Sequence, residues 1–168
     1  MKTLYLVGGP PGAGKTTSCR ILAQMLQKSV FLDGDTCWDT HPFMVTEETK
    51  RMVVANICFL LNSFIACSAI ERIVFCWVMH EQSIIDDILS RLELSNVRVI
   101  PISLVCSEEA LTERIERDIA AGIREDGAVE RGKERLLHYG GVNTVKIDVS
   151  ECDAHTAAEM MMKLGAEQ

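Results

Sequence analysis

The sequence has no C-x-x-C pair, although seven cysteines occur among its 168 residues. Zinc sites need clustered thiolate or imidazole ligands, and the spacing of these cysteines does not provide them. Their number is odd and they are scattered, several of them inside apolar runs, so a disulfide framework is not indicated. We expect reduced thiols that are buried as small apolar side chains, and therefore a cytoplasmic protein.

Positive charge is scarce as well. Lysine and arginine together number 17, against 24 aspartates and glutamates, which gives a net charge of −7 and a pI near 5.1. An acidic surface repels nucleic-acid backbones and anionic lipid head groups, so we expect neither a nucleic-acid partner nor a membrane partner. Any phosphate group that this protein holds therefore needs a local arrangement of cations and backbone N–H groups.

A long uninterrupted hydrophobic run is also absent. Four polar residues interrupt the longest apolar stretch, which covers residues 52–70: Asn56, Asn62, Ser63 and Ser68. This stretch is therefore predicted to be a buried helix and not a membrane span. The apolar run near the N-terminus is too short for a signal peptide. Because no internal repeat or low-complexity linker occurs, the chain is predicted to form a single domain over residues 1–168.

Apolar runs alternate with helical periods along the whole chain. Five apolar runs predict strands, at residues 3–7, 30–32, 72–79, 97–105 and 144–149. Five periodic segments predict helices, at residues 16–27, 46–67, 83–92, 108–121 and 154–164. Strands without polar alternation are typical of a sheet covered on both faces. The pattern predicts a three-layer α/β fold with a doubly wound, five-stranded parallel sheet.

The segment Gly9–Thr16 fits the pattern G-x-x-x-x-G-K-[ST] and lies between a predicted strand and a predicted helix. Such a loop turns its N–H groups towards phosphate, and the helix N-terminus adds its dipole. Lys15 is expected to reach the β- and γ-phosphates, and the Thr16 hydroxyl to bind Mg²⁺. The predicted nucleotide-binding residues here are Gly9, Pro10, Pro11, Gly12, Ala13, Gly14, Lys15, Thr16 and Thr17. A tight Gly/Pro turn with a solvent-facing lysine is the alternative interpretation.

The donor nucleotide is predicted to be ATP, because the sequence has neither an N-K-x-D signature for guanine nor a D-x-x-G switch after a strand. Phosphoryl transfer also needs an acidic residue for Mg²⁺ and a group that orients the acceptor. Asp33 and Asp35 follow the second predicted strand and are two residues apart, so both are expected to face the ligand crevice. A polar Asp-Gly turn is the alternative interpretation of this pair.

These motifs resemble those of the P-loop small-molecule kinases. Phe31–Asp35, Phe-Leu-Asp-Gly-Asp, is similar to the Leu-Asp-Gly-Asp of gluconate kinases, and His41-Pro42 follows as a His-Pro does there. Gluconate and shikimate kinases are the nearest comparison, with the loosely defined "predicted kinase" P-loop proteins. The resemblance implies a P-loop NTPase fold of the nucleotide kinase type. It also implies that Asp33 serves Mg²⁺ and that Asp35 binds or activates the substrate hydroxyl.

A helical lid over about residues 108–139 is the third element that this resemblance implies. Leu111–Arg117 resembles the Leu-x-x-Arg-hydrophobic-x-x-Arg that opens the lid of these kinases. Arg114 and Arg117 share one helix face and are expected to reach the phosphates of ATP. The alternative is a solvated helix with ion pairs along its surface. The chain departs from the family after its third strand, where Glu81 is the nearest acid, so either Asp33 or Glu81 replaces the usual magnesium-binding aspartate.

The sequence thus predicts an ATP- and Mg²⁺-dependent enzyme that moves the γ-phosphoryl group to a hydroxyl of a small molecule. Its predicted catalytic residues are Lys15, Asp33, Asp35 and Arg117, and its predicted magnesium ligands are Thr16 and Asp33. Two alternatives stay open: a nucleoside monophosphate kinase, and an ATP-binding regulatory module with little kinase activity. A monomer and a homodimer are equally compatible with the sequence.

Overall fold

The computed structural model describes residues 1–166, so the last two residues of the predicted domain lie outside the described part. The sheet consists of β1 (Lys2–Gly8), β2 (Ser29–Asp33), β3 (Arg72–Cys76), β4 (Val97–Val105) and β5 (Val145–Asp148). The α-helices are α1 (Lys15–Met25), α2 (Glu47–Ala66), α3 (Gln82–Ser90), α4 (Glu108–Ala120), α5 (Ala128–His138) and α6 (Ala154–Ala166). Two 3₁₀ helices, η1 (Gly34–Trp38) and η2 (Tyr139–Gly141), follow β2 and α5.

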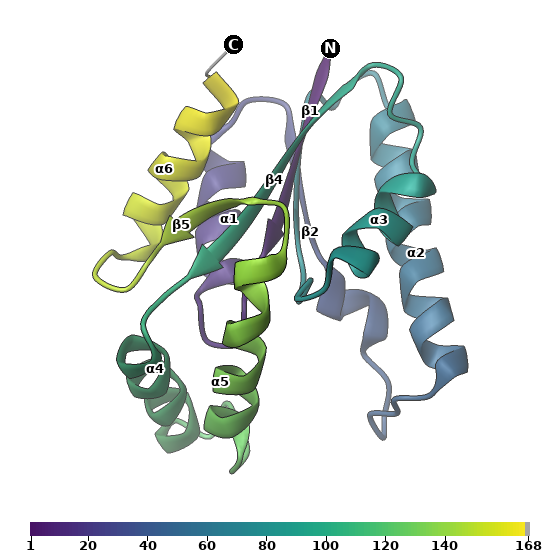
Figure 1. Cartoon of the computed structure of the whole chain (residues 1–168). Coiled ribbons are helices and arrows are strands. Elements are labelled where there is room, and N and C mark those ends of the chain that lie inside the picture. The colour runs from purple at the N-terminus through teal and green to yellow at the C-terminus, as the bar shows by residue number, and fades with distance from the viewer. Residues whose placement is uncertain (167–168) are drawn as a thin grey trace.

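All five strands are parallel and lie in the order β2-β3-β1-β4-β5, which confirms the predicted sheet. The connection that leaves β1 leads to β2 on one side of it, whereas the connection that leaves β3 leads to β4 on the other side of β1. The direction of the connections therefore reverses between β1 and its neighbour β3. Helices α2 and α3 cover one face of the sheet, and α1 and α6 cover the other (Figure 1). In such sheets, ligands bind beyond the carboxyl ends of the strands at the point of reversal.

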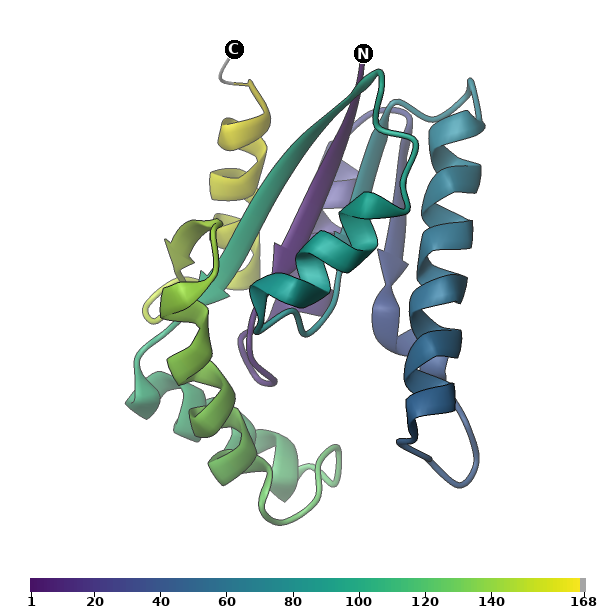
Figure 2. The same ribbon diagram turned by 45° about the vertical axis from the view of Figure 1, so that its right-hand side comes forward.

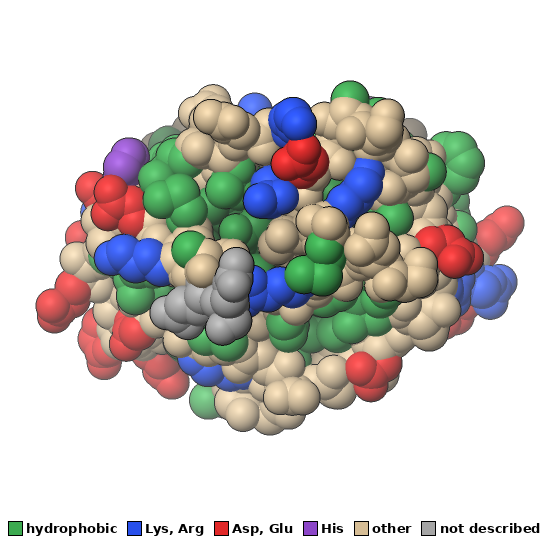
Figure 3. All heavy atoms as spheres, turned by 90° about the horizontal axis from the view of Figure 1, so that it is seen from above, with side chains coloured by type: hydrophobic (Ala, Val, Ile, Leu, Met, Phe, Trp, Pro, Cys, Tyr) green, Lys and Arg blue, Asp and Glu red, His purple; other side chains and the backbone are tan. Residues whose placement is uncertain are grey.

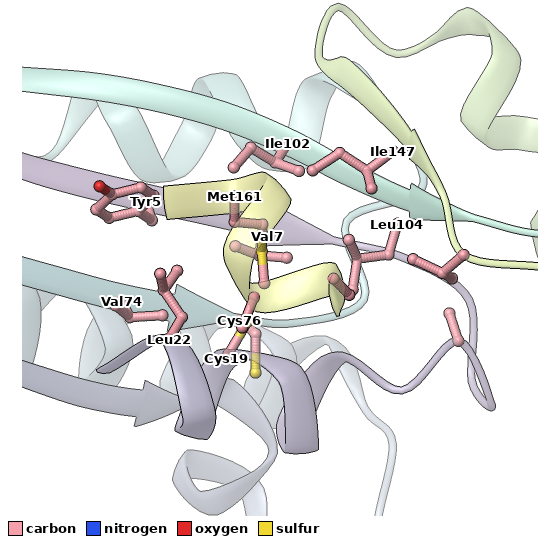
Figure 4. Close-up of a cluster of buried hydrophobic side chains, with 14 of the residues drawn as sticks. Tyr5, Val7, Cys19, Leu22, Val74, Cys76, Ile102, Leu104, Ile147 and Met161 are labelled. Atoms are coloured by element: carbon pink, nitrogen blue, oxygen red, sulfur yellow. The ribbon is translucent and has the colours of Figure 1, made fainter. Parts of the chain in front are cut away.

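Each face of the sheet has its own hydrophobic core, because successive side chains of a strand point to opposite faces. On β1, Tyr5 and Val7 pack with α1 and α6, whereas Leu4 and Leu6 pack with α2 and α3. Figure 4 shows the first of these cores, with Val7 among side chains from the neighbouring strands and from both helices. Burial on both faces explains why the strands read as continuous apolar runs.

The cysteines are all free thiols, and four of them are buried as predicted: Cys19, Cys58, Cys76 and Cys106. Cys19 of α1 lies close to Cys76 at the end of β3 (Figure 4). Burial raises the pKa of the Cys19 thiol well above its ordinary value, and the neighbouring Cys76 raises it further. Cys67, in contrast, is exposed at the end of α2, so the expectation of buried thiols was wrong for this residue.

Helix α2 is only half buried, which corrects the prediction of a buried helix over the longest apolar stretch. Val53, Ile57 and Leu61 are fully buried against the sheet, whereas the side of the helix that carries Phe59 faces away, and Phe59 is 72% exposed. By length and mean hydropathy alone, α2 could also cross a membrane, a test that core helices pass as well. The apolar stretch therefore provides one packed face and one exposed face.

Basic side chains gather at the end of the molecule where the strands begin (Figure 3). Lys2, the first residue of β1, donates hydrogen bonds to the carbonyl oxygens of Phe64 and Cys67 at the C-terminal end of α2. Arg98 of β4 donates to the carbonyl oxygens of Leu164 and Gly165 in the last turn of α6, both at 3.1 Å. These cations satisfy terminal carbonyl groups and oppose the negative end of each helix dipole.

Two predicted elements differ from the structure near the carboxyl ends of the strands. The strand predicted over residues 72–79 ends at Cys76, and the chain then leaves the sheet to reach α3. Within the lid predicted over about residues 108–139, the first helix ends at Ala120, and a second helix, α5, begins after Gly127. Helices α4 and α5 lie on one side beyond the strand ends, and the loop between η1 and α2 lies on the other (Figure 2).

Candidate active site

The phosphate loop connects β1 to α1, as predicted from the Gly9–Thr16 motif. Helix α1 begins at Lys15, directly after Gly14, whose φ of +81° is in the left-handed region. Gly12 also has a left-handed φ, of +89°, and a Cβ at this position would lie 2.7 Å from Cγ1 of Ile115. Only glycine satisfies both demands at residue 12. The loop therefore has the backbone shape that places successive N–H groups and a helix N-terminus around one point.

Lys15 points back over the loop, and its Nζ donates a hydrogen bond to the Pro10 carbonyl oxygen at 3.0 Å. Burial lowers the pKa of the Lys15 ammonium, while nearby negative groups, including Asp35 and Asp33, oppose this shift. The structure thus excludes the alternative of a lysine that extends into solvent. The ammonium lies where the loop and the carboxyl end of β2 meet, which is the position that a polyphosphate held by the loop requires.

Thr16 and Asp33 form a direct pair. The Thr16 hydroxyl donates to Asp33 Oδ2 at 2.6 Å, although the two residues come from α1 and from the end of β2. Hydroxyl and carboxylate oxygens are ligands that Mg²⁺ prefers, and this cation usually keeps several waters besides one or two protein ligands. The pair therefore fits a magnesium ion that also contacts phosphate. No group of three or more His, Cys, Asp or Glu side chains suited to a metal ion occurs within residues 1–166.

Asp35 is not on an extended strand, so the reason given for its orientation from sequence was wrong. The residue belongs to η1, and Asp33 caps this turn by accepting a hydrogen bond from the Asp35 backbone N–H at 3.1 Å. The turn brings the Asp35 side chain close enough to Lys15 for each to influence the other's pKa. Partial burial raises the pKa of the Asp35 carboxyl, Asp33 raises it further, and Lys15 opposes both.

A cavity of about 800 Å³ covers this region and joins the phosphate loop to the surrounding helices. Loop residues Pro11–Thr17 form its floor, and Asp35 and Val78 line one end. The opposite end is formed by α4 and by the segment 149–154 between β5 and α6. A volume of this size is ordinary for a small-molecule or nucleotide site. The cavity therefore brings Lys15, Thr16 and Asp35 into one space.

Glu81 lies outside this group of residues. It precedes α3 as the N-terminal cap residue, is exposed, and accepts a hydrogen bond from the Ser83 hydroxyl at 3.3 Å. It does not line the cavity over the phosphate loop. Between the two acids left open by the sequence, the geometry favours Asp33, which is hydrogen-bonded to Thr16.

The two arginines singled out in the sequence line the cavity but already have partners. Arg114 of α4 donates from Nη2 to the carbonyl oxygens of Val149 and Ser150, and so ties α4 to the segment after β5. Arg117 is 72% exposed and pairs with Glu113 at 3.0 Å, one helical turn before it. This is the geometry of the alternative interpretation, a solvated helix with surface ion pairs. A role for Arg117 at the phosphates stays a prediction.

Arg135 of α5 is a functional candidate that the sequence did not distinguish from the other basic residues near it. It lines the cavity, and no hydrogen bond or ion pair of its guanidinium occurs within residues 1–166. Its charge lowers the pKa of Asp35, so it lies at the same end of the cavity as Asp35. Arg124, which also lines the cavity, is in contrast paired with Asp118 at 2.8 Å. Arg135 differs from the other basic residues by its position near Asp35, and the spacing of residues along the chain does not predict that position.

The helices α4 and α5 rest directly on the phosphate loop. Ile115 of α4 is fully buried and contacts Gly12 of the loop. On its other side it contacts Gly132 of α5, where a Cβ would lie 2.6 Å from Ile115 Cδ1 and 3.6 Å from the Pro11 carbonyl oxygen. The absence of a side chain at both glycines lets three segments meet at one isoleucine. The base of the predicted lid is therefore part of the core on this face of the sheet.

His80 lies just beyond the end of β3, where its ring meets the ring of His138 edge-on, with 5.6 Å between the ring centroids. Its Nδ1 is buried without a hydrogen-bond partner in residues 1–166. Burial lowers the pKa of His80, and the nearby Arg135 lowers it further, whereas Glu81 opposes the shift. The folded chain therefore resists protonation of His80.

This environment predicts a loss of stability on mild acidification. Below the ordinary histidine pKa of about 6.5, the unfolded chain binds a proton at residue 80 more readily than the folded chain does. The stability contributed by neutral His80 is present above about pH 6.5 and is lost as the pH falls towards the lowered folded-state pKa. In His80→Asn, urea unfolding at pH 7 and pH 5 should show a smaller difference than in wild type. An equal or larger difference would contradict the prediction.

Comparison with solved structures places this arrangement among known folds. The chain is similar to the tunicamycin resistance protein of Deinococcus radiodurans, with a TM-score of 0.72 and 17% identity over 100% of this chain and 98% of that one. It is similar to a gluconokinase from Sinorhizobium meliloti 1021, with a TM-score of 0.68 and 20% identity over 98% and 94% of the two chains. It is also similar to a shikimate kinase from Acinetobacter baumannii in complex with shikimate, with a TM-score of 0.64 and 23% identity over 99% of this chain and 93% of that one.

Comparison by sequence gives one family. A search of curated proteins returned no significant match. A family model described as an AAA domain (AAA_18) matches residues 6–133, which is more than half of the chain and includes the phosphate loop, Asp33, Asp35 and α4. The chain therefore belongs to this AAA domain family, and its architecture is that of the nucleotide-binding P-loop small-molecule kinases.

Proposed function

We propose that this protein transfers the γ-phosphoryl group of Mg-ATP to a hydroxyl group of a small molecule. One observation carries the proposal: the phosphate loop with its half-buried Lys15 and the carboxylate of Asp35 share a single cavity. A nucleotide-binding module alone needs the loop, but it does not need a carboxylate next to the position of the γ-phosphate. The gluconokinase and shikimate kinase among the structural neighbours support the same class of acceptor.

The donor side rests on residues of the loop and of α1. Backbone N–H groups of Gly12–Thr16 and the α1 N-terminus bind the phosphate oxygens, and Thr17 adds a contact to the α-phosphate. The Lys15 ammonium exchanges its hydrogen bond with the Pro10 carbonyl for one with the β- and γ-phosphate oxygens. This exchange places a cation where negative charge is redistributed during transfer.

Thr16 and Asp33 are the residues that would hold Mg²⁺. Their oxygen atoms are 2.6 Å apart in a hydrogen bond, and a bound cation would replace that proton contact with two oxygen ligands, directly or through water. When bound, the ion supplies positive charge against the β- and γ-phosphate oxygens.

On the acceptor side, Asp35 orients the attacking hydroxyl. The hydroxyl oxygen forms a bond to the γ-phosphorus, its proton passes to the Asp35 carboxylate, and the bond from the γ-phosphorus to the β–γ bridging oxygen breaks to release ADP. The raised pKa of Asp35 makes its carboxylate a better proton acceptor than an aspartate with the ordinary pKa. Arg135, which faces Asp35 without an ion-pair partner in residues 1–166, binds the transferred phosphoryl group or an anionic group of the acceptor.

The test is a screen for ADP release by the purified chain with Mg-ATP and single acceptors: sugar acids, shikimate-like acids, nucleosides and nucleoside monophosphates. At least one hydroxylated acceptor should raise ADP release at least tenfold above the rate without acceptor, and ³¹P NMR should show one phosphorylated product per ADP. Phosphorylation of a nucleoside monophosphate would instead identify a nucleotide kinase. ATP binding by calorimetry without any acceptor-dependent release would identify a regulatory module and refute the kinase.

A further inference from the structure

Trp77 occupies the first position after β3, where the sequence offers no acidic residue. Its backbone N–H donates to the Val7 carbonyl oxygen at 3.1 Å, so the residue is still held beside β1. Its indole Nε1–H donates to Asp35 Oδ1, also at 3.1 Å. The first residue after β3 is thus a hydrogen-bond donor and not an acid. It donates to Asp35, the carboxylate that is proposed to orient the acceptor.

The indole ring packs against the backbone that links the two aspartates. A Cβ at the buried Gly34 would lie 2.5 Å from Trp77 Cγ and 2.6 Å from Cδ1, so the ring occupies the space that any other residue at position 34 would fill. Contacts this short do not occur between real side chains, so the tryptophan requires glycine at position 34, between the two aspartates. Gly34 and Trp77 form one matched contact between η1 and the end of β3.

The hydrogen bonds of Asp35 divide into two groups with different effects. Its backbone N–H is fixed by Asp33 Oδ1, which sets the turn but leaves the side chain free to rotate. On the carboxylate, Oδ1 accepts from Trp77, and no hydrogen bond to Oδ2 occurs within residues 1–166. The indole N–H is therefore the contact that restrains the rotation of the carboxylate and leaves Oδ2 available in the cavity.

We propose that Trp77 is a positioning residue for the phosphoryl transfer proposed above: its indole N–H holds Asp35 Oδ1 so that Oδ2 meets the acceptor hydroxyl. The inference rests on the proposed function, because it assigns Trp77 a role in orienting the group that acts there. Small displacements of an orienting group cost rate because the reacting atoms leave the attack geometry. Trp77 does not itself touch ATP or the reacting atoms.

The variant Trp77→Phe separates the hydrogen bond from the packing, because phenylalanine keeps an aromatic ring near Gly34 and loses the N–H. We expect kcat for the acceptor identified by the screen to fall about 10- to 100-fold, while the KM for ATP stays within about twofold. In an Asp35→Ala background, adding Trp77→Phe should change the residual rate by less than about twofold. A merely structural role would lower the rate in both backgrounds.

Trp38→Phe is the matched control. It removes the other indole N–H of the chain, which donates to the Met44 carbonyl oxygen at 3.0 Å in the loop before α2, and kcat should stay within about twofold of wild type. A Trp77→Phe enzyme with wild-type kcat, or with an equal loss in the Asp35→Ala background, would overturn the proposal. A wild-type chain that phosphorylates no acceptor would instead refute the proposed function, and the inference would fall with it.

A second measurement does not depend on turnover. The chain has two tryptophans, so its ¹H–¹⁵N spectrum should contain two indole N–H signals, and Trp77→Phe identifies one of them by its loss. Asp35→Ala should move the Trp77 signal and leave the Trp38 signal in place, because only the former donates to Asp35. The signal that remains in Trp38→Phe is that of Trp77, so the assignment does not depend on the folding of Trp77→Phe. A Trp77 signal that does not respond to Asp35→Ala would overturn the contact.

Discussion

Replacement of Lys15 by alanine should abolish tight ATP binding and reduce any phosphoryl transfer on the order of 100-fold or more. The ammonium lies next to both Asp35 and the loop: its Nζ donates to the Pro10 carbonyl oxygen, and the two aspartates oppose the lowering of its pKa by burial. Without it, the carboxylates of Asp33 and Asp35 face the polyphosphate with no ammonium between them. Isothermal calorimetry with Mg-ATP measures the affinity, and the screen with the best acceptor measures the rate.

Lys50→Ala is the control for loss of a lysine. This side chain is exposed in the first turn of α2, where it pairs with Glu47 at 2.9 Å. Exposed ion pairs contribute little, so both ATP affinity and rate should stay within about twofold of wild type. If Lys15→Ala retained wild-type ATP affinity, the assignment of the loop as the phosphate site would be refuted, because the ammonium would then not contact the phosphates.

Asp35→Asn should separate the acceptor from the donor. The amide keeps an oxygen that accepts from Trp77, but it does not take a proton, so kcat should fall about 100-fold or more. ATP affinity should be unchanged or slightly higher, since a negative charge near the γ-phosphate has been removed. This combination, a lost rate with retained binding, distinguishes an acceptor-orienting residue from one that holds the nucleotide.

The matched control for that variant is Asp39→Asn, which changes an exposed aspartate four residues further along the chain. Asp39 Oδ1 lies 3.5 Å from His41 Nε2, and both side chains are largely exposed. Its substitution should leave kcat within about twofold of wild type. The acceptor role of Asp35 would be wrong if Asp35→Asn kept a wild-type kcat, or if it lost ATP affinity as severely as Lys15→Ala.

The parts of the site that were predictable from the sequence are local. A phosphate loop needs glycines and a lysine at fixed spacing, so the sequence of Gly9–Thr16 is sufficient to predict the shape of its backbone. The parallel sheet was predictable because burial on both faces leaves strands without polar alternation, as Leu4–Val7 shows. The pairing of Thr16 with Asp33 followed from the rule that ligands gather at the carboxyl ends of parallel strands.

The parts that were missed depend on tertiary contacts between distant segments. Trp77 and Asp35 meet only because β3 lies beside β2, and a tryptophan after an apolar strand predicts no particular partner. Arg135 differs from Arg117 by the face of the cavity it reaches, which is set by how α5 packs and not by charge spacing. The composition of α2 likewise did not show that only one of its faces meets the sheet, leaving Phe59 exposed.

The contact of Gly12, Ile115 and Gly132 links the two substrates of the proposed reaction. Gly12 lies in the loop proposed to receive ATP, and Gly132 is on the same helix as Arg135, so Ile115 packs between the loop and the helix that carries this guanidinium. If ATP binding changes acceptor affinity through this contact by some factor, the acceptor changes ATP affinity by the same factor. Synergy between the substrates that is transmitted here would then depend on the apolar packing of one isoleucine side chain.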